Sequence, residues 1–173
     1  DNLVWTLQAG QTDKVITKNS SATSTDGMSL LMQSVNLSYQ EDARQFIWRS
    51  GTDKATFALA YQKPEKMSEM YQSGYLTLKV RINKSPGEHT DLQVMCSQKQ
   101  CLRKVSFSSF DAILSDKKWH TLAIPLSCND KGTESKAITE VLKVEANEAS
   151  IAFADIGLTI KPNSDAVVVK CSN

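Results

Sequence analysis

The sequence predicts an all-β fold, an antiparallel β-sandwich with one or two short helices. Short segments of two-residue hydrophobic alternation recur along the whole chain, and this period is typical of strands with one buried face. Turn-forming residues separate these segments, whereas helical periodicity is sparse. Roughly ten short strands at regular spacing favour a single sandwich with jelly-roll-like connections.

The clearest strand is expected at residues 75–82, YLTLKVRI, where apolar and polar side chains alternate strictly. Residues 119–126 repeat this alternation, with Leu122, Ile124 and Leu126 on one face. Residues 150–160, SIAFADIGLTI, are expected to place five apolar side chains on one face: Ala152, Ala154, Ile156, Leu158 and Ile160.

Two segments carry a helical signal. Residues 109–118, SFDAILSDKK, predict one or two helical turns with Ser109 as the N-cap. Residues 134–145 fit either a short helix or a strand. The polar stretches 11–27 and 62–74 are expected to be long loops that offer surface for contacts.

Composition limits the classes of partner. The chain has 20 Lys and Arg against 19 Asp and Glu, and it shows no basic stripe, so no nucleic-acid partner is expected. No apolar run approaches membrane-spanning length, so no membrane insertion is expected. Residues 1–173 are expected to form one domain. Because they begin DNLVWTL without a starting Met, we expect a piece cut from a longer precursor.

Catalytic motifs are absent from the sequence, which contains no nucleophile elbow, no zinc-protease helix and no phosphate loop. Of the two histidines, His89 lies in a polar turn and His120 is expected to be partly buried and structural. Carboxylate pairs drawn from distant positions leave no local pattern, so they stay open. No catalytic residue is assigned, and a non-catalytic domain is the favoured interpretation.

The four cysteines are expected to form disulfides, because their number is even and no histidine stands beside any of them. Three pairings are open. A bridge within MCSQKQC would clasp two strands, and a second bridge would hold the C-terminal strand. The four-residue spacing argues against a redox motif. Disulfides indicate an extracytoplasmic location: periplasm, cell surface or secretion. The cysteines are Cys96, Cys101, Cys128 and Cys171.

No metal site and no cofactor are predicted, with calcium as the one ion left open. A β-sandwich needs only loop oxygens to hold calcium. One polar segment faintly resembles a calcium loop, although an ordinary turn is the preferred interpretation: Asn129, Asp130, Gly132 and Glu134.

Sugar binding is the remaining site chemistry that the residues allow. An aromatic ring can pack against the C–H face of a sugar, while Arg, Gln and carboxylates bond its hydroxyls. Arg44, Phe46 and Trp48 share one strand face. The preferred interpretation is nevertheless that Phe46 and Trp48 belong to the core, and the same ambiguity applies to Trp5 and Trp119.

Several segments occur in an order that resembles a known family. They are YQEDARQFIW, MCSQKQC, the W…LAIPLSC run, ADIGL and a terminal cysteine, and they extend from residue 28 to residue 171. In this order they resemble the extra C-terminal domain of bacterial family 3 glycoside hydrolases, the exo-1,3/1,4-β-glucanases in particular. The resemblance implies a sandwich of the galactose-binding-domain type.

The resemblance implies a non-catalytic domain of an exo-acting β-glucanase or β-glucosidase that degrades polysaccharides. It would stabilise the catalytic domains of the same polypeptide and contribute to binding β-1,3/1,4-glucan at the active-site entrance. The alternatives are an autonomous carbohydrate-binding module for β-glucans and a plain structural or adhesive sandwich. The parent's catalytic carboxylates lie upstream, so none is carried over. The carbohydrate-binding candidates are Gln40, Glu41, Asp42, Arg44 and Trp48.

Overall fold

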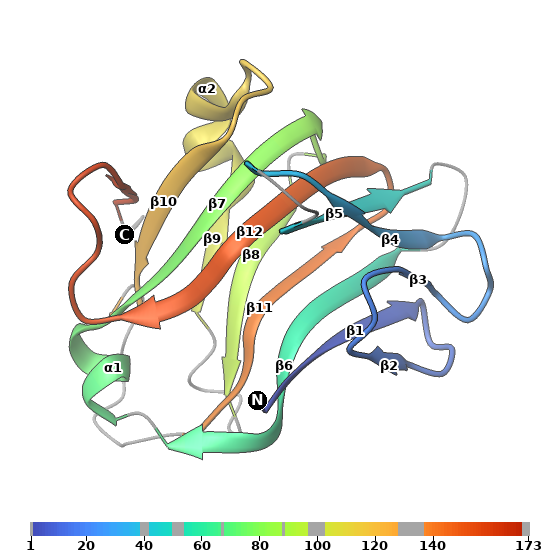
Figure 1. Ribbon diagram of the computed structural model, residues 1–173, viewed down its shortest axis with the longest axis horizontal. Helices are drawn as coiled ribbons and strands as arrows, with labels where there is room; N and C mark the ends of the chain where they lie inside the picture. Colours follow the sequence, from blue (N-terminus) through green and yellow to red (C-terminus); the bar gives the residue numbers. More distant parts are fainter. Residues whose placement is uncertain are drawn as a thin grey trace.

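The computed structural model is a sandwich of two β-sheets, with short helices at its periphery (Figure 1). No helix in the described part is long and apolar enough to cross a membrane. The residues that the structure describes are 2–38, 42–49, 54–66, 68–87, 89–96, 103–127 and 137–170.

The first sheet has six strands, in the spatial order β2-β1-β6-β11-β8-β9. All neighbouring pairs are antiparallel. Its strands are β1 (Leu3–Ala9), β2 (Val15–Thr17), β6 (Ala55–Lys66), β8 (Asp91–Cys96), β9 (Arg103–Ser106) and β11 (Ala137–Ala146).

The second sheet has seven strands, in the order β13-β10-β7-β12-β5-β4-β3. Its pairs are antiparallel except β10 and β13, which run parallel at one edge. Its strands are β3 (Ala22–Thr23), β4 (Leu30–Val35), β5 (Ala43–Trp48), β7 (Tyr75–Lys84), β10 (His120–Pro125), β12 (Ala149–Thr159) and β13 (Val167–Val168).

The alternation in β7 is confirmed, because its even-numbered residues from Leu76 to Ile82 are buried. Strand β10 pairs with it in register, and Leu122 and Ile124 lie on the same core face. The core-facing side chains of both strands are apolar, and this face of the seven-stranded sheet is buried against the six-stranded sheet. The predicted all-β sandwich is confirmed.

Strand β12 departs from the predicted pattern. Its pairing with β7 shifts after Ala154, where a bulge inserts extra residues. Ala152 and Ala154 therefore face away from the core, whereas Leu158 faces it, so the prediction of a single shared face was wrong. Asp155 sits in this bulge with φ 47°, a left-handed conformation that Asp tolerates better than most residues.

The helices also differ from the sequence-based expectation. A 3₁₀ turn (Phe107–Phe110) and α2 (Asp111–Leu114) form where helical turns were predicted, but Ser106 rather than Ser109 is the N-cap. Residues 137–146 are a strand, so the helical alternative fails there.

Neither predicted loop is a simple loop. Strand β6 continues to Lys66, and α1 (Ser68–Ser73) follows it within the segment 62–74. The segment 11–27 contains strands β2 and β3. In both segments tertiary pairing orders polar residues that carry no strong local signal.

An aromatic cluster joins the two sheets. Phe46 on β5 stacks on Phe57 on β6, with ring centroids 3.8 Å apart and planes 13° apart. Phe153 lies 5.3 Å from Phe57, and Trp5 lies 5.4 Å from Phe46. Both stacked phenylalanines are fully buried. Aromatic contacts of this kind add to the free energy gained from area burial.

Replacing Phe57 by Ala is expected to lower the free energy of unfolding by about 3 to 5 kcal/mol, because a buried aromatic ring is lost and a cavity remains. Urea denaturation measures this loss. The control is Ile16→Ala, whose side chain is 64% exposed and whose loss should stay within about 0.5 kcal/mol. Equal losses would contradict the central place of Phe57.

The turn before β4 is held by one carboxylate. Asp26 accepts hydrogen bonds from the Ser24 hydroxyl at 2.6 Å, from the backbone N–H groups of Met28 and Ser29 at 3.1 Å each, and from the Ser29 hydroxyl. These bonds, those from Ser24 first and Ser29 second, hold the pKa of Asp26 well below its usual range. Gly27 supplies the positive φ of 71° that the turn requires.

Because the folded-state pKa of Asp26 is depressed, its stabilisation is present above the unfolded pKa near 4 and is lost as pH falls toward the folded value. Asp26→Asn is expected to lower the free energy of unfolding by only about 1 kcal/mol at pH 7, because solvent screens an exposed carboxylate. The difference from the native chain should shrink below about pH 4. Denaturant titrations at several pH values measure it, and a pH-independent difference would contradict this account.

Candidate functional site

The structure places Trp48 in the core, so the proposed sugar contact of this residue is corrected. Its side chain is 2% exposed, and Nε1 donates a hydrogen bond to the carbonyl oxygen of Ala55 at 2.9 Å. That bond satisfies the indole N–H inside the sandwich. The ring belongs to the aromatic cluster and is closed to a ligand at the surface.

Asp42 and Arg44 do come together. Both line a cleft between the two sheets, which we call the inter-sheet cleft, with a volume of about 250 Å³. Asp42 is exposed and accepts a hydrogen bond from the backbone N–H of Leu37 at 2.7 Å. Gln40 and Glu41 lie outside the described residues.

The inter-sheet cleft receives residues from both sheets. Trp5 and Leu59 belong to β1 and β6 of the six-stranded sheet, and Arg44 belongs to β5 of the other. The bulged part of β12, from Phe153 to Ile156, completes the lining. Trp5 is only partly buried, in contrast to Trp48. Trp5 is thus the tryptophan of the aromatic cluster that reaches this surface.

The chemistry of the cleft is mixed. Arg44 brings a guanidinium, Asp42 and Asp155 bring carboxylates, and Trp5 brings an indole. This combination offers hydrogen-bond donors, acceptors and an aromatic surface, which are the groups that a saccharide needs. Two of the residues selected from the sequence therefore share one site, with Trp5 and Asp155 as additions. The sequence left Trp5 ambiguous. The signal for the bulge that positions Asp155 was the change of the large apolar residues from odd positions (Ile151, Phe153) to even ones (Leu158), which the prediction of a single shared face did not use.

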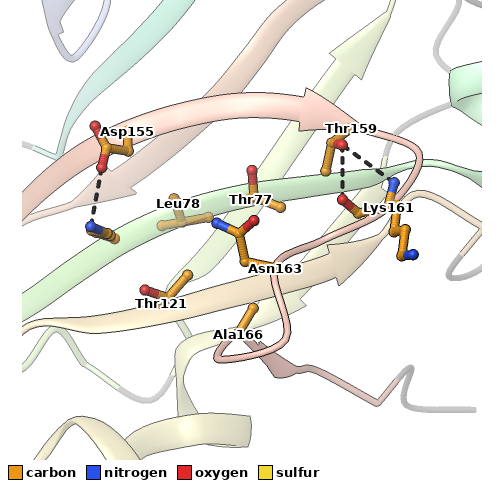
Figure 2. Close-up of a pocket in the computed structure, with 9 residues that line it drawn as sticks. Thr77, Leu78, Thr121, Asp155, Thr159, Lys161, Asn163 and Ala166 are labelled. Carbon is orange, nitrogen blue, oxygen red and sulfur yellow. Dashed lines mark hydrogen bonds and ion pairs between the residues drawn. The ribbon is translucent and has the colours of Figure 1, made fainter.

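A second hollow lies on the outer face of the seven-stranded sheet, beneath the chain segment that follows β12 (Figure 2). It has a volume of about 230 Å³. Asp155 lines this hollow as well, and its carboxylate lies 3.3 Å from the ammonium of Lys79. The other lining residues are Thr77, Leu78, Thr121, Thr159, Lys161, Asn163 and Ala166.

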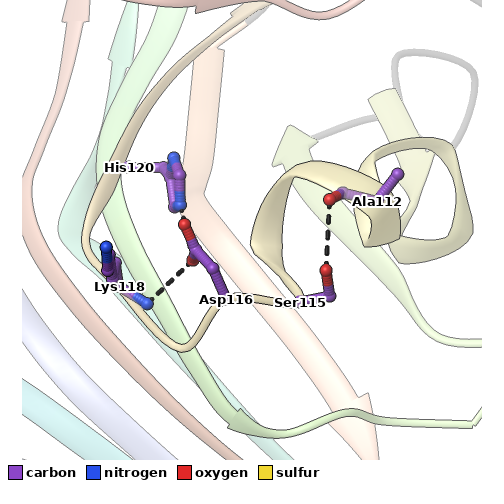
Figure 3. A network of polar contacts seen from close by, with 5 residues as sticks. All are labelled: Ala112, Ser115, Asp116, Lys118 and His120. Atoms are coloured by element: carbon purple, nitrogen blue, oxygen red, sulfur yellow. Dashed lines mark hydrogen bonds and ion pairs between the residues drawn. The ribbon is translucent and has the colours of Figure 1, made fainter.

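The two histidines have the environments that the sequence predicts. His89 is exposed. His120 is partly buried, and Figure 3 shows its Nε2 beside the carboxylate of Asp116, at 2.8 Å. The His120 imidazole, together with the backbone N–H of Lys118, holds the pKa of Asp116 below its usual range. This network ties the loop after α2 to the start of β10 and is structural in its geometry.

Most residues of the metal and disulfide predictions lie outside the described residues. Within those residues no group of three or more His, Cys, Asp or Glu side chains could hold a metal ion. Residues 129–134, which resemble a calcium loop, lie outside them, as do Cys101, Cys128 and Cys171. Cys96 ends β8. The disulfides therefore stay a prediction.

The comparison with known families decides the relationship. Residues 5–158 match the family Exop_C, described as galactose-binding domain-like. The chain belongs to this family. Both the galactose-binding-like fold and the resemblance read from the motifs are thereby confirmed.

Two solved structures from a Pseudoalteromonas species are similar to this chain over at least 99% of its length. The exo-1,3/1,4-β-glucanase ExoP is 47% identical, with a TM-score of 0.88 over 99% of this chain and 20% of that chain. Its extra C-terminal domain is 46% identical, with a TM-score of 0.89 over 100% of this chain and 94% of that chain. The chain thus spans about one fifth of the glucanase and is homologous to its extra C-terminal domain.

More distant structures share the fold alone. A family 30 carbohydrate-binding module from a cellulosomal cellulase of Clostridium thermocellum is 12% identical, with a TM-score of 0.57 over 92% of each chain. No match is found among curated proteins.

Proposed function

We propose that this chain is a non-catalytic accessory domain of an exo-acting β-glucanase, where it stabilises the catalytic domains and contributes to substrate binding at the active-site entrance. The observation that carries the proposal is 46% identity to the extra C-terminal domain of ExoP over the full length of this chain. Identity at this level over a complete domain favours a shared role as well as a shared fold, although fold alone would not.

The proposed partners are the catalytic domains of the same polypeptide and β-1,3/1,4-glucan or its oligosaccharides. The proposed location is extracytoplasmic, in the periplasm, at the cell surface or secreted. The even number of cysteines and the polymeric substrate both support that location.

Deletion of the domain from the full-length enzyme that carries it tests the accessory role. We expect a lower melting temperature, because contacts between the domains are lost, and a KM for polymeric glucan raised several-fold. The kcat on a small aryl glucoside should change little, because the proposed role of this domain involves no contact with the bond that is cleaved. Unchanged melting temperature, kinetics and linkage preference would reject the accessory role.

One observation favours a second function, an autonomous carbohydrate-binding module for β-glucans. The inter-sheet cleft gathers an indole, a guanidinium and two carboxylates in one solvent-accessible site. A module of this kind would hold the parent enzyme on its polymeric substrate.

Calorimetric titration of the 173-residue chain with a laminari-oligosaccharide tests the cleft. We expect Asp42→Asn to weaken binding about tenfold or more, because Asn can keep the hydrogen bond from Leu37 but loses the charge that strengthens a bond to a sugar hydroxyl. Asp13→Asn, an exposed position in the β1–β2 turn, is the matched control and should leave affinity unchanged. No heat at millimolar ligand would reject the second function.

A further inference from the structure

Strand β7 presents a row of polar side chains on the outer face of the seven-stranded sheet. Thr77, Lys79 and Arg81 alternate with the buried residues of the same strand, and we call them the β7 row. Strand β12 places only small residues beside them: Gly157 opposite Thr77, Ala154 opposite Lys79 and Ala152 opposite Arg81. The polar side chains of the row therefore have little bulk next to them on that side.

The guanidinium of Arg81 is held by an aromatic ring but has no carboxylate partner among the described residues. Its guanidinium lies 4.9 Å from the ring centroid of Trp119, the residue that leads into β10. Its Nε is buried without a hydrogen bond, and no described residue forms a hydrogen bond or an ion pair with the side chain. A stacked guanidinium loses little further side-chain entropy when it binds a ligand.

The other cations of β7 have carboxylate partners. Lys79 pairs with Asp155 at 3.3 Å, and Lys84 pairs with Glu148. Arg81 thus remains the cation of this strand that can accept an outside anion. The planar fork of arginine matches an oxyanion such as a carboxylate with two parallel hydrogen bonds.

The hollow at the other end of the row suits hydroxyl groups. Asn163 reaches from the segment after β12 over the sheet, near Thr77 (Figure 2). The side chains of Thr121 and Asn163 have no hydrogen-bond partner among the described residues, so their donors and acceptors are available. A volume of about 230 Å³ lies below the usual range for drug-sized ligands and fits a single sugar unit.

The distance along the row sets the ligand's length. Thr77 and Arg81 are four residues apart on one strand, which places them roughly 13 Å apart. A ligand that fills the hollow and reaches Arg81 must therefore be longer than one sugar. It must also carry an anionic group at one end and hydroxyls at the other.

We propose that the outer face of the seven-stranded sheet binds an acidic oligosaccharide along the β7 row. Sugar hydroxyls occupy the hollow at Thr121 and Asn163, and a carboxylate or sulfate group of a further sugar binds Arg81. This site shares Asp155 with the inter-sheet cleft, but the proposed contacts at Thr121, Asn163 and Arg81 lie outside that cleft. Its ligand is charged, in contrast to the neutral β-glucan of the proposed function.

The test is a calorimetric titration of the 173-residue chain with three tetrasaccharides of equal length. One is a tetraglucuronate, one is a sulfated tetraglucan and one is an unsubstituted tetraglucan. We expect one or both charged ligands to bind at least about tenfold tighter than the neutral one, because an ionised acceptor strengthens the bonds from Arg81. The two charged arms distinguish carboxylate from sulfate. Equal affinity for all three, or no binding at millimolar ligand, would overturn the proposal.

Variants locate the site. Arg81→Gln is expected to weaken the charged ligand at least about tenfold, and Arg81→Lys to weaken it less. Thr121→Val, close in shape, should weaken it several-fold by removing the hydroxyl. Lys104→Gln removes an exposed charge from β9 on the other sheet and should leave the affinity unchanged.

Two further readouts keep the test decisive. Thermal melts check that each variant is folded. Equal losses in Arg81→Gln and Lys104→Gln would mean non-specific charge attraction and would overturn the site. Asp42→Asn in the inter-sheet cleft should leave binding of the charged ligand intact, so failure at one site is distinguishable from failure at the other.

Discussion

The stacked contact between Phe46 and Phe57 is the constraint on which the rest of this structure depends. It joins the two sheets through rings that are fully buried. Because side chains alternate along a strand, fixing these two rings inward fixes the facing of their neighbours on β5 and on β6 up to Leu59, where the pairing with β11 shifts. Gln45 is thereby turned outward, where its amide donates to the hydroxyl of Ser150 at 2.8 Å. Arg44 is turned toward the inter-sheet cleft, and Trp48 is turned into the core.

The second constraint is the bulge in β12. Without it, the outward-facing Ala152 and Ala154 would be followed by an outward-facing Leu158, and an apolar side chain would lie on the solvent face. The bulge returns Leu158 to the core and leaves Asp155 at the point where the inter-sheet cleft and the outer hollow meet. A left-handed non-glycine residue costs backbone energy, so its presence at the boundary of two polar hollows is consistent with a functional position.

Much of the fold was predictable because it depends on alternation. In β7 each buried residue is apolar and the partly buried residues between them are polar, so the period of two is visible without any tertiary information. In β10 the core-facing Leu122 and Ile124 follow the same period, although Ala123 between them is buried as well. The bulge was missed because residues 151–154 are all apolar, so the segment reads as one face of even-numbered residues. The large apolar side chains in fact change parity across Asp155, from Ile151 and Phe153 to Leu158. Helix α1 and the short strands β2 and β3 were missed because their order comes from pairing and packing rather than from local propensity.

The candidate site was predictable only in part, for the same reason. The sequence placed Arg44 and Trp48 on one face, which is correct. It could not show that Arg44 lines the inter-sheet cleft whereas Trp48, four residues later on the same face, is buried in the core. Burial of Trp48 depends on the carbonyl of Ala55 across the sandwich, a partner that no local pattern reveals. Trp5 stands on a strand of the opposite sheet, so its approach to Arg44 is set by sheet packing alone.

The edges of the two sheets bear on how such a domain meets its neighbours. Three of the four edge strands, β2, β3 and β13, are only two or three residues long. Short edges offer few free backbone groups, and this discourages pairing with strands of another domain. A chain with such edges would contact another domain through side chains and turns rather than by extending a sheet. Its two polar hollows lie between the sheets and on a sheet face, where side chains rather than free strand edges provide the hydrogen-bonding groups.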